Sequence, residues 1–140
     1  MLVGLGHVDL VCNDIERSLA FYSAVFGELG LQPPHEVPGE RGETIFYLRF
    51  PQPGSGSLGL RQALEEQPFE LYAPGFHHLA LAVETAADVD NAHAAVVAAG
   101  GEVLHAPRLW PEYHPDYYAT FFADPDGFRI EVAASRDARL

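Results

Sequence analysis

The fold is decided by a stretch that occurs twice in the chain, as GLGHVDL at residues 4–10 and as GFHHLAL at residues 75–81. When the sequence is slid along itself by 71 residues, glycine meets glycine, histidine meets histidine and leucine meets leucine in these stretches. The match continues without a gap as far as Gly30, which meets Gly101. A shift of one more residue carries the match into later segments, where Phe50 meets Phe122. Self-similarity of this kind indicates two modules of one design.

Each module carries four segments typical of strands, because they are short and rich in Val, Leu, Phe or Tyr and are bounded by Gly, Pro and Asp. The predicted strands are residues 7–12, a poorly marked one near Leu31, 44–50 and 57–62 in the first module, and 78–83, 102–105, 117–123 and 128–133 in the second. Two longer segments, 33–43 and 106–116, are predicted to be loops. Loops of this length in a small domain are more often functional than idle.

A helix is predicted after the first strand of each module, because apolar residues recur there at helical spacing. Asn13 and Glu16 have the spacing of a capping box at the start of the first helix. Thr85 opens the second helix, and the glycine pair at 100–101 closes it, since glycine tolerates the left-handed conformation of a helix end. Each module is therefore predicted to be βαβββ.

The predicted fold class is α+β, with two tandem βαβββ modules that form a curved, barrel-like mixed sheet and carry their helices on its outer face. We expect one domain over residues 1–140. Module one is expected at 1–62, a linker at 63–75, module two at 76–134 and a short tail at 135–140.

The amino-acid composition limits the classes of partner that the chain can bind. The 140 residues are 48% apolar, enough for a core, and carry a net charge of -12. Such an acidic chain is repelled by nucleic acid and by anionic membranes, so neither partner is expected. Apolar runs fall short of the about 18 residues of a spanning helix, and the N-terminus has no basic signal-peptide region. A single cysteine, Cys12, fits a reducing compartment, so we expect a cytoplasmic protein with a small-molecule partner.

Strand parity gathers the residues that could carry chemistry. Glu131 lies between two apolar residues of the last strand, so it faces away from the helices, and the repeat gives Gly59 the equivalent place in module one. His7 and His78 occupy the same face at the first strand of each module. Two imidazoles and one carboxylate can hold a divalent metal with open coordination positions. A one-residue slip would put His77 in place of His78, but His77 is level with Gly6, so His78 is favoured.

The chain resembles the vicinal oxygen chelate superfamily, which includes glyoxalase I, fosfomycin-resistance enzymes, extradiol dioxygenases, methylmalonyl-CoA epimerase and bleomycin-resistance proteins. The resemblance covers nearly the whole chain and rests on the paired modules, His7, FHHLAL at 76–81 and DPDGFRIE at 124–131. In metalloenzymes of this superfamily the ligands come from the first and last strands of each module. The resemblance therefore implies His7, His78 and Glu131 as metal ligands.

One position departs from the superfamily. Glyoxalase I has a second carboxylate ligand where this chain has Gly59, which argues against conventional glyoxalase activity. The remaining set resembles that of extradiol dioxygenases and fosfomycin-resistance enzymes. Fosfomycin-type activity is disfavoured in turn, because Asp9 replaces a small hydroxyl residue beside the first histidine. The only candidates for a phosphonate-binding cluster are three arginines near the C-terminus, Arg129, Arg136 and Arg139, and a solvated face is the favoured role for them.

The resemblance implies a metal-dependent enzyme, either a glyoxalase-like lyase or isomerase or an extradiol-type dioxygenase, that acts on a small oxygen-bearing substrate. Glu131 would also be the catalytic residue that shuttles protons. The metal stays open among Fe, Mn, Ni, Co and Zn. A homodimer is implied as well, in which His7 of one chain joins His78 and Glu131 of the other. The alternative is a metal-free protein of the bleomycin-resistance type that binds a drug or metabolite.

Further side chains are predicted to line the substrate pocket: Asp9, Tyr47, Arg49, Trp110, Tyr113, His114 and Tyr118. Asp9 is either a partner that orients a ligand histidine or an ordinary polar edge residue. An aromatic segment, made up of Trp110, Tyr113, His114 and Tyr117, either closes over a ligand or is packed down by its own side chains.

Overall fold

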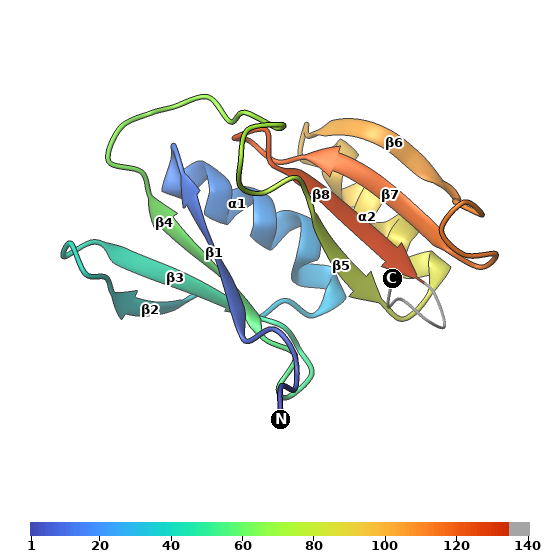
Figure 1. Cartoon of the computed structure of the whole chain (residues 1–140), viewed down its shortest axis with the longest axis horizontal. Helices are drawn as coiled ribbons and strands as arrows, with labels where there is room; N and C mark the ends of the chain where they lie inside the picture. Colours follow the sequence, from blue (N-terminus) through green and yellow to red (C-terminus); the bar gives the residue numbers. More distant parts are fainter. Residues whose placement is uncertain (135–140) are drawn as a thin grey trace. The chain divides into compact units, whose positions relative to one another are not determined.

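The structure, a computed structural model, describes residues 1–134 of the chain (Figure 1). The predicted tail at 135–140, with Arg136 and Arg139, lies outside the described residues. The chain divides into two compact units, Met1–Gln67 and Pro68–Leu140, and the boundary falls within the predicted linker 63–75.

In the first unit the elements follow in the order β1 (His7–Cys12), α1 (Ile15–Phe26), the 3-10 turn η1 (Gly27–Leu29), β2 (His35–Pro38), β3 (Thr44–Arg49) and β4 (Ser57–Gln62). The second unit contains β5 (Leu79–Val83), α2 (Ala86–Ala98), β6 (Glu102–Leu109), β7 (Tyr118–Ala123) and β8 (Arg129–Ala134). The strands form two four-stranded sheets, in the orders β1-β4-β3-β2 and β5-β8-β7-β6.

The two sheets have the same design. The first strand of each unit pairs in parallel with the last, and the other neighbours are antiparallel. The predicted α+β class with two tandem modules is confirmed. The strands of each module pair only with one another among the described residues. They therefore form two separate mixed sheets instead of one continuous sheet.

One face of each sheet carries the core and a helix. In the first unit α1 packs against β4 and buries Phe21, Tyr22 and Val25, while the strands contribute Leu10, Leu48, Leu58 and Leu60. In the second unit α2 lies across β6, β7 and β8 and buries Val89, Ala92 and Val96 with Phe122, Ile130 and Val132 (Figure 1). The opposite face of each sheet is left for the candidate site residues.

Two predicted loops contain strand structure. The strand expected near Leu31 lies instead at residues 35–38, inside the predicted loop 33–43, because Pro33 and Pro34 lack the amide protons that a ladder needs. β6 continues four residues beyond the predicted end at His105 and passes through Pro107. Both β2 and β6 are edge strands, where proline is tolerated. The register of β6 is irregular, with shifts between Val103 and His105 and between His105 and Arg108.

The predicted cap of the first helix is wrong by one residue. Asp14 is the N-cap, and its carboxylate accepts from the Arg17 amide at 3.0 Å. Asn13 serves another purpose, because its side-chain amide donates to the carbonyl of Gln67 at 2.8 Å and accepts from the amide of Gln67 at 2.9 Å. An amide side chain matches a peptide group with both a donor and an acceptor, which a carboxylate cannot do.

The predicted start and end of the second helix are confirmed. Thr85 Oγ1 accepts from the Asp88 amide at 3.2 Å, and Asp88 Oδ2 accepts from the Thr85 amide at 3.0 Å. Gly100 follows the helix with a φ of 71°, in the left-handed region. No helix within residues 1–134 has both the length and the apolar character that a membrane crossing requires.

The capping box gives a test of the second unit's stability. Thr85→Ala removes the acceptor for the Asp88 amide, so we expect the free energy of unfolding to fall by about 1 kcal/mol in urea titrations. Thr85→Ser keeps a hydroxyl at the same place and should retain most of that free energy. Equal losses in the two variants would contradict a capping role.

Candidate functional site

Glu131 is the most buried candidate residue. It lies on β8, with Ala80 of β5 on one side in register and Phe121 of β7 on the other. Only 3% of the residue is exposed. Its Oε2 lies 3.2 Å from His78 Nε2, and its Oε1 accepts a hydrogen bond of 2.6 Å from the Tyr117 hydroxyl. Both oxygens of the buried carboxylate are therefore engaged.

His78 connects this carboxylate to the surface. It stands directly before β5 and is exposed, and its Nδ1 lies 2.8 Å from Nδ1 of His77. The His77 ring instead contacts the ring of Tyr72, with 5.4 Å between centroids. Of the two adjacent histidines, His78 is thus the one whose ring reaches the carboxylate.

An aromatic cluster surrounds Glu131 on the same face of the sheet, and its members are His105, Trp110, Tyr113, Tyr117 and Phe121. Trp110 lies edge-on to Phe121 with centroids 5.0 Å apart, and its indole N–H donates to the Ala119 carbonyl at 3.1 Å. The guanidinium carbon of Arg108 lies 3.3 Å from the Trp110 ring centroid. Trp110 is only 8% exposed, so the segment is held on the sheet by its own side chains.

Tyr113 and His114 sit at the outer end of this segment. Tyr113 is half-exposed and stacks on Trp110, with 6.1 Å between ring centroids. His114 is exposed and pairs with the carboxylate of Asp116. Tyr113 and His105 are therefore the members of the cluster that a ligand can reach.

Tyr117 was predicted only as a member of the aromatic segment, and its hydrogen bond to Glu131 was not foreseen. Burial raises the pKa of its hydroxyl, and the hydrogen bond to Glu131 raises that pKa further. Tyr117 therefore stays protonated and donates to the carboxylate at any ordinary pH. The alternation of side chains along the chain could have identified Tyr117, because residues 117, 119 and 121 point to the same face of the sheet as Glu131.

The predicted pocket residue Tyr118 lies on the other face of β7. Its hydroxyl donates to Asp90 Oδ1 of α2 at 2.8 Å. The pKa of Tyr118 is raised, first by this hydrogen bond. The structure thus puts Tyr118 on the helix side of the sheet, away from Glu131. Arg49, at the end of β3, is exposed and lines an open hollow of about 360 Å³ with Gln32 and the turn before β4.

The site face of the first unit carries an ion-paired cluster. Asp9 Oδ2 lies 2.5 Å from Nη2 of Arg61 and 3.3 Å from the Tyr47 hydroxyl, which donates to it. Arg61 Nη1 lies 3.2 Å from Glu43 Oε1. The Asp9 hydrogen bond raises the pKa of Arg61, so the guanidinium stays charged. Backbone hydrogen bonds and the two nearby arginines hold the pKa of Glu43 below its usual value, although partial burial opposes them.

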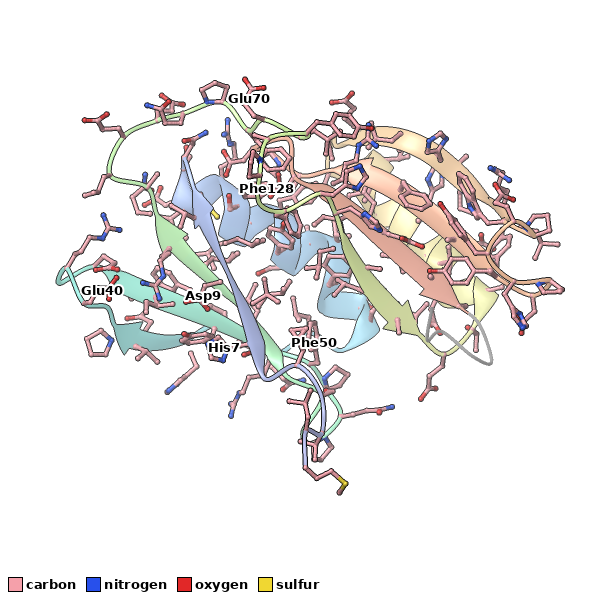
Figure 2. The ribbon with its side chains drawn as sticks, in the orientation of Figure 1. His7, Asp9, Glu40, Phe50, Glu70 and Phe128 are labelled. Atoms are coloured by element: carbon pink, nitrogen blue, oxygen red, sulfur yellow. The ribbon has the colours of Figure 1, made fainter. Side chains whose placement is uncertain are left out.

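Asp9 is thus an ion-paired residue and not an idle edge residue, and its guanidinium partner was missed from the sequence. The alternation of side chains could again have identified this partner, since Arg61 lies two residues after Gly59 on β4 and is on the same face of the sheet. His7 shares that face at the start of β1, with its ring edge against Tyr47 at 5.6 Å between centroids (Figure 2). Figure 2 shows His7 and Asp9 on the same side of β1.

Gly59 has a steric reason to be glycine. It is level with Asp9 of β1 and Tyr47 of β3. A Cβ at this position would lie 2.8 Å from Asp9 Cγ and 2.8 Å from Tyr47 Cε1, and closer still to Asp9 Oδ1. The space that a side chain at residue 59 would need is therefore filled by the Asp9 carboxylate and the Tyr47 ring. The position that lacks a ligand in the sequence therefore provides, in the structure, the space for the side chain of Asp9.

Within residues 1–134, no three His, Cys, Asp or Glu side chains are grouped closely enough to hold a metal ion. Two of the three predicted ligands, His78 and Glu131, meet in the second unit. The third, His7, belongs to the first unit, so its membership of the site stays a prediction. The donor types fit a divalent transition metal, which accepts imidazole nitrogen and carboxylate oxygen.

Comparison with known proteins adds a family match over most of the chain. A family model described as the Glyoxalase/Bleomycin resistance protein/Dioxygenase superfamily matches residues 4–132. Lactoylglutathione lyase of Salmonella typhimurium is 27% identical over 132 residues, which cover 94% of this chain and 93% of that protein.

Two solved structures have the same fold. A glyoxylase/bleomycin resistance protein/dioxygenase domain from Frankia superposes with a TM-score of 0.80 at 22% identity and covers 97% of this chain and 100% of its own. A glyoxalase/bleomycin resistance protein from Albidiferax ferrireducens gives a TM-score of 0.70 at 26% identity, with 94% and 98% covered.

The crowding at Gly59 predicts an energetic coupling with Asp9. Gly59→Ala should lower the free energy of unfolding by about 1–3 kcal/mol, because the new Cβ overpacks the site. In an Asp9→Ala background the same change should cost less, with a coupling energy above about 0.5 kcal/mol in a double-mutant cycle of urea titrations.

Gly27→Ala is the matched control for this cycle. Gly27 is helical, with a φ of -58°, and a Cβ there meets nothing within 4 Å, so alanine should be neutral or mildly stabilising. Strict additivity between positions 9 and 59 would contradict the steric account of Gly59.

Proposed function

Because this chain belongs to the Glyoxalase/Bleomycin resistance protein/Dioxygenase superfamily, we propose that it is a metal-dependent enzyme acting on a small oxygen-bearing substrate. The observation that carries the proposal is the contact between His78 Nε2 and Glu131 Oε2, at 3.2 Å. These atoms are the two donors that a divalent metal would take from the second unit. His7 is the third ligand in the proposal.

The separation of the two donor atoms suits a shared metal. Ligand atoms bound about 2.1 Å from a metal and at right angles to each other lie about 3 Å apart. The 3.2 Å between Nε2 and Oε2 is close to that value, so a cation could enter with only small movements of the two side chains. The carboxylate is already desolvated, at 3% exposure, and this strengthens its attraction for a cation.

The bound metal would supply Lewis-acid polarisation of a substrate oxygen. With two neutral imidazoles and one carboxylate, the centre keeps a net charge of about +1 and open positions for two adjacent substrate oxygens. Within this site Glu131 would hold the metal and would also be the group that moves a proton, and the exposed ring of Tyr113 lies where a substrate could stack. Arg108 and Trp110 fix the wall behind Tyr113.

Among the chemistries of the superfamily we favour a lyase or isomerase reaction over ring-opening dioxygenation. The support is the likeness to the Salmonella lactoylglutathione lyase along nearly the full length of both chains. Gly59 argues for a substrate other than the one in the name of this relative. In the first unit the space for a side chain at residue 59 is taken by the carboxylate of Asp9, which is ion-paired with Arg61. The proposal includes a cytoplasmic homodimer in which His7 of one chain meets His78 of another, and light scattering tests the dimer.

A second candidate function is sequestration of a drug or metabolite without metal. It is favoured by the aromatic cluster beside a buried carboxylate and by the net charge of -12, which suit a cationic aromatic ligand. Chelator-treated protein that binds such a ligand with unchanged affinity would support this candidate over the enzyme.

Metal analysis of protein purified without chelator tests the leading proposal. We expect about one divalent ion per chain, and His78→Ala, Glu131→Gln and His7→Ala should each weaken metal affinity by more than about 100-fold, beyond the effect of losing a supporting residue. The measurement is competition with a chromogenic chelator.

His35→Ala is the matched control, because His35 is an exposed histidine of β2 far in sequence from the proposed ligands. His77→Ala tests the register and should keep the ion. A wild-type protein that holds no ion and ignores added divalent metals would refute the metal-dependent function.

A further inference from the structure

The Tyr117 hydroxyl and the Glu131 carboxylate form the most enclosed polar contact of the second unit's site face. Tyr117 is 2% exposed and Glu131 is 3% exposed, and their oxygens are 2.6 Å apart. A hydroxyl–carboxylate bond this short is of the strong, charge-assisted kind. At this degree of burial, water does not readily take the place of the hydroxyl.

We infer that Tyr117 is a positioning residue, which holds Oε1 of Glu131 so that Oε2 faces His78. The inference rests on the proposed function in one respect, because the value of this orientation is that it leaves one defined oxygen for a metal. Tyr117 itself touches neither metal nor substrate in this account.

The need for such a residue follows from the freedom of a glutamate side chain. The terminal torsion of glutamate is broad and nearly two-fold, so an unrestrained carboxylate offers either oxygen or turns away. A hydrogen bond to Oε1 fixes that torsion before any ligand arrives. Preorganisation of this sort is what outer partners of metal ligands commonly provide.

The position of the hydroxyl is set by the loop and not by Glu131. The Tyr117 amide donates to the His114 carbonyl at 3.0 Å, and the Tyr117 carbonyl accepts from the Trp110 amide at 2.7 Å. The ring lies edge-on to Tyr113 with centroids 5.5 Å apart. Backbone hydrogen bonds and ring packing therefore hold Tyr117 in place independently of Glu131, and the Glu131 carboxylate takes its orientation from the Tyr117 hydroxyl.

The next residue supplies a matched control. Tyr118 also donates its hydroxyl to a carboxylate, at 2.8 Å, but the acceptor is Asp90 on α2, on the opposite side of β7. Tyr118→Phe therefore deletes the same kind of bond at the neighbouring residue, without touching Glu131.

The first measurement needs no metal. In a crystal structure of metal-free Tyr117→Phe we expect Glu131 Oε2 to lie more than about 3.5 Å from His78 Nε2, beyond hydrogen-bond distance, because Oε1 has lost its donor and the terminal torsion of Glu131 is no longer fixed. Tyr118→Phe should keep the 3.2 Å contact. If Tyr117→Phe keeps it as well, the positioning role is refuted.

The second measurement uses Co²⁺ as the probe. Tyr117→Phe should bind Co²⁺ about 10–100-fold more weakly than the wild type and change its visible absorption, a signature of ligand geometry that a loss of stability alone does not produce. Tyr118→Phe should match the wild type in affinity and spectrum. An unchanged affinity and spectrum in Tyr117→Phe would also overturn the inference.

The two proposals fail separately. A wild type that binds no Co²⁺ refutes the metal-dependent function, and the metal-free structure still decides whether Tyr117 orients Glu131. If the phenylalanine variant does not fold, Tyr117→Met also lacks the hydroxyl and repeats both measurements.

Discussion

The parallel pairing of the first strand with the last strand in each unit decides which side chains can meet on the site face. In the second unit this pairing puts Ala80 level with Glu131, so His78, two residues before Ala80 and directly before β5, reaches the carboxylate on the neighbouring strand. In the first unit the same pairing puts Asp9 level with Gly59. A hairpin connection would make these neighbours antiparallel. The helix that links β1 to the rest of its module is what permits the parallel geometry.

The two units use that shared geometry differently. In the second unit the carboxylate comes from the last strand, and the first strand contributes only the small Ala80 beside it. In the first unit the carboxylate comes from the first strand, and the last strand has Gly59, which lacks a side chain, at the level position. Acidic side chains at both of two level positions would repel each other, because level residues on neighbouring strands have Cβ atoms about 5 Å apart. The glycine and the aspartate are one structural feature and are best understood together.

Much of this organisation is readable from the sequence, and the failures have physical causes. The repeat and the alternation of strands predict the two modules, the face of Glu131 and the cap at Thr85. The edge strand β2 was misplaced and β6 was predicted too short, because proline breaks the pattern of a central strand but not of an edge strand. Tyr118 was assigned to the pocket although the repeat aligns it with Phe46, which β3 turns away from Tyr47 and Gly59. Arg61 escaped notice because its meaning depends on Asp9 and Glu43, which are distant in sequence.

Charge compensation finally separates the two clusters. In the first unit the carboxylates of Asp9 and Glu43 share the guanidinium of Arg61, and Arg41 adds a second positive charge to Glu43. That cluster is balanced by groups that are always cationic. The partners of Glu131 are a phenol, which is neutral, and an imidazole, which is charged only when protonated. A buried carboxylate is costly unless a positive charge accompanies it. The second unit therefore has the stronger electrostatic demand for a cation, which a metal bound between His78 and Glu131 would satisfy.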